Sequence, residues 1–314
     1  MNEPGRVCPL RYRYGAGAIG RTETRKAQTL YVVGGLYGNV PALDVIDAMA
    51  RIEATAPTLC FNGDFNWFNV DDASFVEINR RVLANDAILG NVEAELDSPA
   101  DEAGCGCAYP ASIDGGIVER SNRIHAELKA TAARHEALLG RISTLPMFAR
   151  YQVGDCRIGV VHGDADSLAG WRFEVQALDD PQALPWLQSA FETADVDLFA
   201  GTHTCLPALR RFALAPGRDG CVVNNGAAGM PNFEGDLAGL CTRIAATPSP
   251  HPVVQELRIA GAYVALLPVR YDADRWRTEF LAQWPPGSPA WQSYLERITR
   301  GPKFAPNQAL TPAR

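Results

Sequence analysis

The sequence predicts an α/β protein, because short apolar runs of strand length alternate with segments that have helical spacing. The clearest case is the apolar, β-branched run TLYVVG at residues 29–34, which precedes the helical pattern VPALDVIDAMARIEA at residues 40–54. This run, like several others, stops at a glycine with a polar residue nearby. Ligands of α/β sheets gather outside the carboxyl ends of the strands, so we expect these strand ends to form one functional rim.

Further strands and one long helix follow in chain order. The apolar run at residues 58–61 leads to Asp64, and the run at residues 87–89 leads to Asn91. Residues 235–260 are rich in alanine and proline and indicate no clear element. The other expected strands lie at residues 157–161, 196–200, 209–214, 221–223 and 262–271, and the expected helix lies at about residues 117–142.

Length and composition indicate a soluble globular protein. With 314 residues the chain has room for two domains, but one α/β domain with insertions is equally allowed. Hydrophobic residues make up 47% of the chain, and no run approaches the roughly 18–20 apolar residues needed to cross a bilayer. Since the first residues also lack the continuous apolar stretch of a signal peptide, we expect a cytoplasmic protein without membrane contact.

The net charge of the chain limits the kinds of molecule that it could bind. A net charge of −7 argues against nucleic acid, which requires a basic face. A small phosphorylated substrate or ligand is compatible with it. The sequence does not indicate the oligomeric state.

The eight cysteines are scattered through the chain, and several lie in apolar runs. This pattern favours reduced thiols in the core over a framework of disulfides. An alternative is a thiolate zinc site built from Cys105, Cys107 and Cys205, although a single Cys-x-Cys pair is a weak signal for one.

Five short segments carry polar residues at the expected rim. They are GGLYGN at residues 34–39, NGDF at 62–65, GNVE at 90–93, VHGD at 161–164 and AGTHT at 200–204. Their order and spacing resemble the calcineurin-like metallophosphoesterase family, whose blocks run D-x-H-G-N, G-D, G-N-H-[DE], H-G and G-H-T-H. The later segment NNGAAGMP, at residues 224–231, resembles the N-P-G-S-x-G-x-P loop of the same family.

The resemblance covers about residues 29–271 and implies a four-layer α/β/β/α sandwich. We expect a single domain with an insertion at residues 94–116. Residues 1–28 would form an N-terminal arm. Residues 272–314 would form a C-terminal extension with a mobile tail, since the last residues are polar and rich in proline.

In this family an aspartate bridges two metal ions, and Asp64 matches its position. Gly35 and Tyr37 occupy the places of the aspartate and histidine in the first block. Glycine offers no side-chain donor, and a neutral tyrosine is a poor ligand for a hard cation. The resemblance therefore implies that one of the two metal positions is vacant or very weak.

The other metal position keeps most of its ligands. Asp64, Asn91 and His162 match the family pattern, whereas Gly201 stands in place of the first histidine of the fifth block. A slip of one residue in that loop would let His203 serve instead. The implied cofactor is a divalent metal ion (Mn, Zn or Fe), one per chain, in line with catalytic zinc sites that have few protein ligands.

The third block lacks the histidine that in the family protonates the leaving oxygen. Val92 stands in its place, while Glu93 keeps the adjacent carboxylate. Loss of a positioned general acid costs roughly 10²- to 10⁴-fold when the leaving group is poor. We assign catalytic roles to Glu93 and His162 and expect any hydrolysis to favour acidic leaving groups.

Simpler interpretations exist for most of these residues. Asp64 and Asn91 are also common in turns, and His162 could be an ordinary core histidine. Arg11 and Arg13 could bring an arm over the rim to bind phosphate, or belong to an exposed edge strand with solvated charges. Three further histidines are expected at the surface: His125, His135 and His251.

The function predicted from the sequence is metal-dependent hydrolysis of a phosphoester by a divergent, mononuclear enzyme. The substrate would be a small phosphorylated molecule. The alternative is a catalytically inactive protein of the same fold that binds a phosphorylated ligand or a partner protein. The loss of ligands in several blocks at once supports this alternative.

Overall fold

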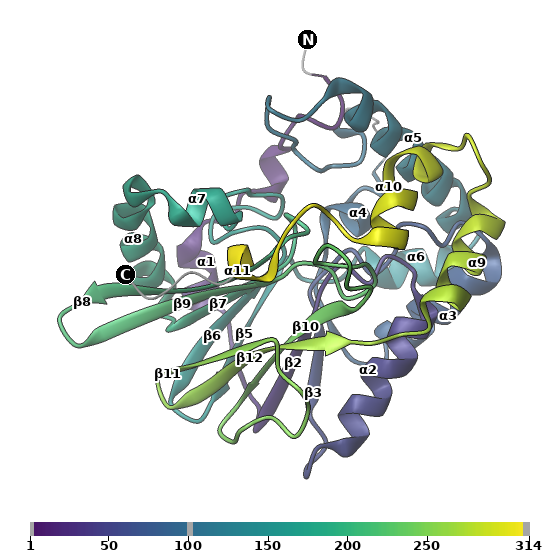
Figure 1. Cartoon of the computed structure of the whole chain (residues 1–314). Helices are drawn as coiled ribbons and strands as arrows, with labels where there is room; N and C mark the ends of the chain where they lie inside the picture. Colours follow the sequence, from purple (N-terminus) through teal and green to yellow (C-terminus); the bar gives the residue numbers. More distant parts are fainter. Residues whose placement is uncertain (1–2, 99–102, 310–314) are drawn as a thin grey trace.

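The structure is a computed structural model that describes residues 3–98 and 103–309, and it contains two six-stranded sheets that lie face to face (Figure 1). Sheet I consists, in spatial order, of β1 (Thr24–Lys26), β5 (Phe148–Val153), β6 (Cys156–Val161), β7 (Leu198–Gly201), β9 (Arg218–Asn225) and β8 (Pro207–Ala215). Sheet II consists of β11 (Gln255–Ile259), β12 (Ala262–Val269), β10 (Gly239–Ala245), β2 (Thr29–Val33), β3 (Thr58–Phe61) and β4 (Asp86–Ala87). Both sheets are mixed: β6, β7 and β9 are parallel in sheet I, and β2, β3 and β4 are parallel in sheet II, where β10, β11 and β12 pair in an antiparallel manner.

Helices cover the outer face of each sheet. On sheet I these are α1 (Ala16–Arg21), α7 (Val175–Asp179) and α8 (Leu184–Ala194). On sheet II they are α2 (Val40–Ile52), α3 (Asp72–Val82), α5 (Gly115–Ala132), α6 (Glu136–Ile142), α9 (Ala273–Gln283) and α10 (Pro289–Arg300). The remaining short helices are α4 (Asn91–Ala94), α11 (Pro306–Ala309) and the 3-10 turns η1 (Leu10–Tyr12) and η3 (Pro181–Ala183).

Alternation of side chains along the strands explains the layers. In β2, Leu30 and Val32 pack into the core between the sheets, whereas Tyr31 and Val33 pack against the helices outside sheet II. A strand buried on both faces must be apolar at every position, which is why this segment reads as a continuous apolar run. The predicted four-layer α/β/β/α sandwich is thereby confirmed.

Polar residues fix where the helices begin. Asn39, the last residue of the first motif, accepts a hydrogen bond on Oδ1 from the backbone N–H of Ala42 at 2.9 Å and so caps α2. Asp272 and Ser288 cap α9 and α10 in the same way. The cap of α2 therefore also anchors the loop that carries Gly35 and Tyr37.

Several sequence predictions need correction. The helix expected at about residues 117–142 is two helices, α5 and α6, which are separated at residues 133–135. Residues 235–260, without a predicted element, contain the strands β10 and β11. His125 is buried rather than at the surface, and its Nε2 lies 3.0 Å from the carbonyl oxygen of Val92. His251 is likewise shielded, with 7% of its side chain exposed.

The N-terminal arm is part of the fold. Its strand β1 pairs in parallel with β5 at the edge of sheet I. Arg11 forms an ion pair with Glu95, and Arg13 forms a β-bridge with Ser167. Arg11 is therefore neutralised by a carboxylate, which argues against the phosphate-binding alternative for these arginines.

Parts of three predicted segments lie outside the described residues. These are residues 1–2 of the arm, residues 99–102 of the insertion and residues 310–314 of the tail. None of the helices in the described part of the chain combines the length and hydrophobicity that a bilayer-spanning segment needs.

Candidate metal centre

The candidate ligands follow the ends of neighbouring strands. Asp64 comes after β3, His162 directly after β6 and His203 two residues after β7, while Asn91 begins the short helix α4. Parallel strands bring their carboxyl ends to the same edge of a sheet, and the two sheets bring both edges together. Asp64, His162 and His203 form a buried group whose ligand atoms lie within 4.8 Å of one another.

The ligand atoms surround a common point. His162 Nε2 lies 3.0 Å from Asn91 Oδ1, 3.4 Å from Asp64 Oδ1 and 3.2 Å from His203 Nδ1. Four tetrahedral ligands with bonds of about 2.0–2.1 Å to zinc lie roughly 3.3 Å from one another. The three distances to His162 Nε2 are therefore close to those expected around a single divalent ion of that size.

Backbone carbonyls orient the ligands. His162 Nδ1 donates to the carbonyl of Asn62 at 2.9 Å, and His203 Nε2 donates to the carbonyl of Cys107 at 3.1 Å. A carbonyl oxygen only accepts, so the proton is fixed on these nitrogens and the lone pair of the other ring nitrogen is directed at the site. Such contacts hold metal-binding histidines in the required tautomer.

The amide of Asn91 is oriented in the same manner. Its Nδ2 donates to the carbonyl of Cys105 at 2.9 Å, which turns Oδ1 toward His162. Two nitrogen lone pairs and two oxygen atoms then face one another in a buried site. Such an arrangement is electrostatically unfavourable unless a cation or a proton lies between them.

The pKa values reflect this crowding. Burial and the nearby His162 lower the pKa of His203 to about 3, so its ring is neutral near pH 7, the form that binds metal. Burial opposes a charge on His162, but the Asp64 carboxylate outweighs it and raises the pKa of that histidine. In the absence of a metal ion, a proton on Nε2 of His162 would thus reduce the repulsion between the lone pairs that face one another in the site.

Glu93 holds the backbone around Asp64 in place. Its carboxylate accepts backbone N–H groups from Asp64 at 2.8 Å, from Asn66 at 3.0 Å and from Gly90 at 3.2 Å. Burial, followed by repulsion from Asp64, raises the pKa of Glu93 to about 7. These contacts make Glu93 a positioning residue, while its predicted catalytic role stays a prediction.

Solved structures with the same architecture identify the fold. A metallophosphoesterase from Sphaerobacter thermophilus matches 88% of this chain and 100% of its own length, with a TM-score of 0.54 and 17% identity. Hypothetical protein PH1004 from Pyrococcus horikoshii OT3 matches 89% of this chain and 100% of its own length, with a TM-score of 0.57 and 15% identity. The chain has the metallophosphoesterase fold. No protein-family model and no curated protein sequence matches it.

The ring of Tyr37 packs against Gly35 in the first motif. Gly35 has a φ of +63°, and a Cβ at that residue would lie 2.9 Å from Cε2 of Tyr37 and 3.2 Å from the Cα of Ala227. The Tyr37 hydroxyl lies 2.8 Å from Cys205 Sγ, and burial raises the pKa of Tyr37 well above its usual range. A neutral phenol ring therefore takes the space that the ligands of the first block would need.

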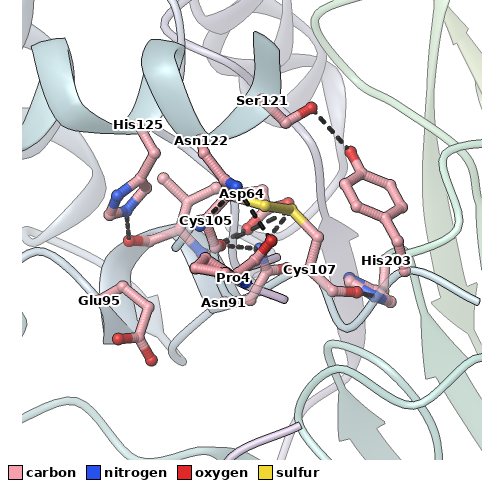
Figure 2. Close-up of a disulfide and its surroundings, with 12 residues drawn as sticks. Pro4, Asp64, Asn91, Glu95, Cys105, Cys107, Ser121, Asn122, His125 and His203 are labelled. Carbon is pink, nitrogen blue, oxygen red and sulfur yellow. Dashed lines mark hydrogen bonds between the residues drawn. A yellow bond between two sulfur atoms is a disulfide. The ribbon is translucent and has the colours of Figure 1, made fainter. Parts of the chain in front are cut away.

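Two of the cysteines next to the site are not free thiols. Cys105 and Cys107 form a disulfide beside Asn91 and His203 (Figure 2). The expectation of reduced thiols is thus wrong for this pair, and neither sulfur is available for the thiolate zinc site. The carbonyls of the same two residues are the ones that orient Asn91 and His203.

Sequence reasoning missed several residues that face the site. Asp64, Asn91 and His203 line a cavity of about 340 Å³ whose wall also contains Trp171, Glu174, Tyr294 and Arg297. None of these belongs to a motif of the metallophosphoesterase fold, and two come from α10 in the C-terminal extension. Their signal was only their type, because they are aromatic or charged residues outside the recognised segments.

Proposed function

We propose that this protein hydrolyses a phosphoester of a small molecule with one divalent metal ion. The ion would be held by Asp64, Asn91, His162 and His203. The observation that carries the proposal is the convergence of these four ligand atoms at spacings of 3.0, 3.2 and 3.4 Å around His162 Nε2. The metallophosphoesterase fold supports it.

The site also has the access that hydrolysis requires. Three of the ligand residues line the cavity, whereas His162 is completely buried behind them. A divalent cation at this point would supply a Lewis acid for a phosphoryl oxygen and promote the attack of water. Carbonyl contacts hold the ligands in place before a metal or substrate arrives, so little reorganisation is needed on binding.

A second candidate function is binding without catalysis. The neutral ring of Tyr37 packs against Gly35 where the resemblance places ligands of a second metal, and Val92 stands where it places the proton donor. Both changes remove groups that hydrolysis uses in the family, but they leave a cavity next to the site. A protein of this kind would hold a phosphorylated ligand or a partner protein and release no phosphate.

Metal content distinguishes a mononuclear from a binuclear site. Protein purified without chelator and then incubated with manganese or zinc should hold one ion per chain, because Gly35 and Tyr37 provide no ligands for a second. Elemental analysis after gel filtration measures this number. Two ions per chain would contradict the mononuclear site, and none would support binding without catalysis.

Substrate preference tests the catalytic part of the proposal. With manganese or zinc added, bis-nitrophenyl phosphate should be hydrolysed slowly and an alkyl monoester much more slowly. The reason is that nitrophenolate leaves without protonation, whereas an alkoxide requires the missing acid. Release of nitrophenol and of inorganic phosphate provides the two measurements, and equal rates on both substrates would argue against the loss of the acid.

A further inference from the structure

Five aromatic side chains line the cavity next to the candidate metal centre. We call it the aromatic pocket; its rings are those of Tyr37, Trp67, Tyr109, Trp171 and Tyr294. Its volume of about 340 Å³ lies at the lower end of the range of about 300–1,000 Å³ that is typical of small-molecule sites. It can therefore hold one small ligand but no folded partner or nucleic-acid chain.

Protein contacts hold two of these rings in place. The indole Nε1 of Trp171 donates to the carbonyl of Cys107 at 3.0 Å, and the Tyr109 hydroxyl lies 3.1 Å from Ser121 Oγ. The two rings are 5.9 Å apart, and Trp171 is 5.2 Å from the ring of His203. Because their polar atoms already have partners in the protein, these rings offer chiefly apolar surface and ring edges to a ligand.

Two further rings come from α10 and from the loop after β3. Tyr294 and Trp67 are in edge-on contact, with ring centroids 6.5 Å apart. A pocket lined by several rings is suited to a planar aromatic group, because such a group can stack on aromatic side chains. An alkyl group would gain only its apolar burial.

Arg297 supplies positive charge to the same pocket. Its Nε donates to the carbonyl of Pro231 at 3.1 Å and its Nη2 to the carbonyl of Cys205 at 2.6 Å. A guanidinium has five N–H groups, so these two bonds leave three of them for a ligand. No carboxylate within residues 3–98 and 103–309 forms an ion pair with Arg297. Its charge is thus available to an anion.

We propose that the aromatic pocket binds a small phosphate ester whose organic group is a planar aromatic ring. The ring would lie among Tyr109, Trp171 and Tyr294. The phosphate would lie between the metal ligands and the guanidinium of Arg297, since Cys205, which anchors that guanidinium, is two residues after His203. This proposal rests on the proposed function, which places the phosphate at the metal ligands. It adds that the substrate belongs to the class of aromatic phosphate esters.

The test measures binding without turnover. Phenylphosphonate and butylphosphonate have no ester bond, so calorimetry on the full chain with added manganese reports affinity alone. We expect phenylphosphonate to bind roughly tenfold more tightly or better. Tyr294→Leu should remove most of this preference, and Tyr294→Phe, which keeps the ring, should retain it. Equal affinities of the two phosphonates for the unaltered protein would overturn the proposal.

A second set of variants tests the role of Arg297 and uses a control residue on the same helix, α10. Arg297→Met should weaken both phosphonates by roughly ten- to a hundredfold, because it removes charge-assisted hydrogen bonds, and Arg297→Lys should restore part of the loss. The matched control is Arg300→Met, which removes the same charge from an exposed residue of α10. Equal effects of the two methionine variants in folded protein would overturn the role of Arg297.

The outcome for the inference can be separated from the outcome for the proposed function. Hydrolysis without any preference for aromatic esters would overturn the inference and leave the proposed function intact. A preference for phenylphosphonate in a protein that releases no phosphate from any ester would support the inference and count against hydrolysis.

Discussion

Asp64→Asn is expected to abolish tight binding of a divalent metal and any hydrolysis, while the protein stays folded. Asp64 is the carboxylate among the converging ligands, and a hard divalent ion requires that negative charge. Loss of contacts that merely support a ligand weakens metal affinity by about 10- to 100-fold, so loss of the carboxylate itself should cost more. Metal titration followed by calorimetry measures the change.

Asparagine is the right replacement because of the backbone at this position. Asp64 has a φ of +53°, a left-handed conformation that asparagine and aspartate tolerate better than other non-glycine residues. The amide oxygen of the variant side chain could also still accept the N–H of Val92, which lies 3.3 Å from Asp64 Oδ1. Asp274→Asn, on the exposed face of α9, controls for the change in net charge. Full metal affinity in the folded Asp64→Asn variant would eliminate the site described above.

The parts of the fold that could be predicted are those with local signals. β2 is buried at every position and carries hydrophobic side chains from Leu30 to Val33, and the motif residues after it are adjacent in sequence. β10 gave no such signal. It contains the buried Arg243, whose charge is paired with Glu53 from the end of α2, so a strand in the middle of sheet II looks polar in the sequence.

The candidate site divides in the same way. Asp64, Asn91 and His162 were assigned from motifs, and His203 from an assumed slip in its loop, and the structure brings the four together. The remaining features depend on contacts between distant segments. The carbonyls of Cys105 and Cys107 contact Asn91 and His203, the Tyr37 hydroxyl contacts Cys205, and Arg297 comes from α10; no local sequence pattern predicts these contacts.

Val92→His is expected to raise the rate on an alkyl monoester by about 10²-fold, the lower end of the range for general acid catalysis, with little change on bis-nitrophenyl phosphate. Val92 lies in the segment next to Asp64 and is one of the residues that line the cavity beside the candidate metal centre. A histidine there could protonate an alkoxide, whereas nitrophenolate needs no proton. The measurement is phosphate release at several pH values, since a histidine acid should make the rate fall as the pH rises.

Val92→Phe is the matched control for that gain. It adds a ring of similar size without a proton to donate, so its rates should not exceed those of the unaltered protein. An equal gain for the histidine and phenylalanine variants would assign the effect to packing and contradict the missing acid. If neither variant nor the unaltered protein releases phosphate from any ester, the aromatic pocket would serve binding alone. A single bound metal ion cannot protonate the leaving oxygen, and the histidine of Val92→His would already have supplied that proton.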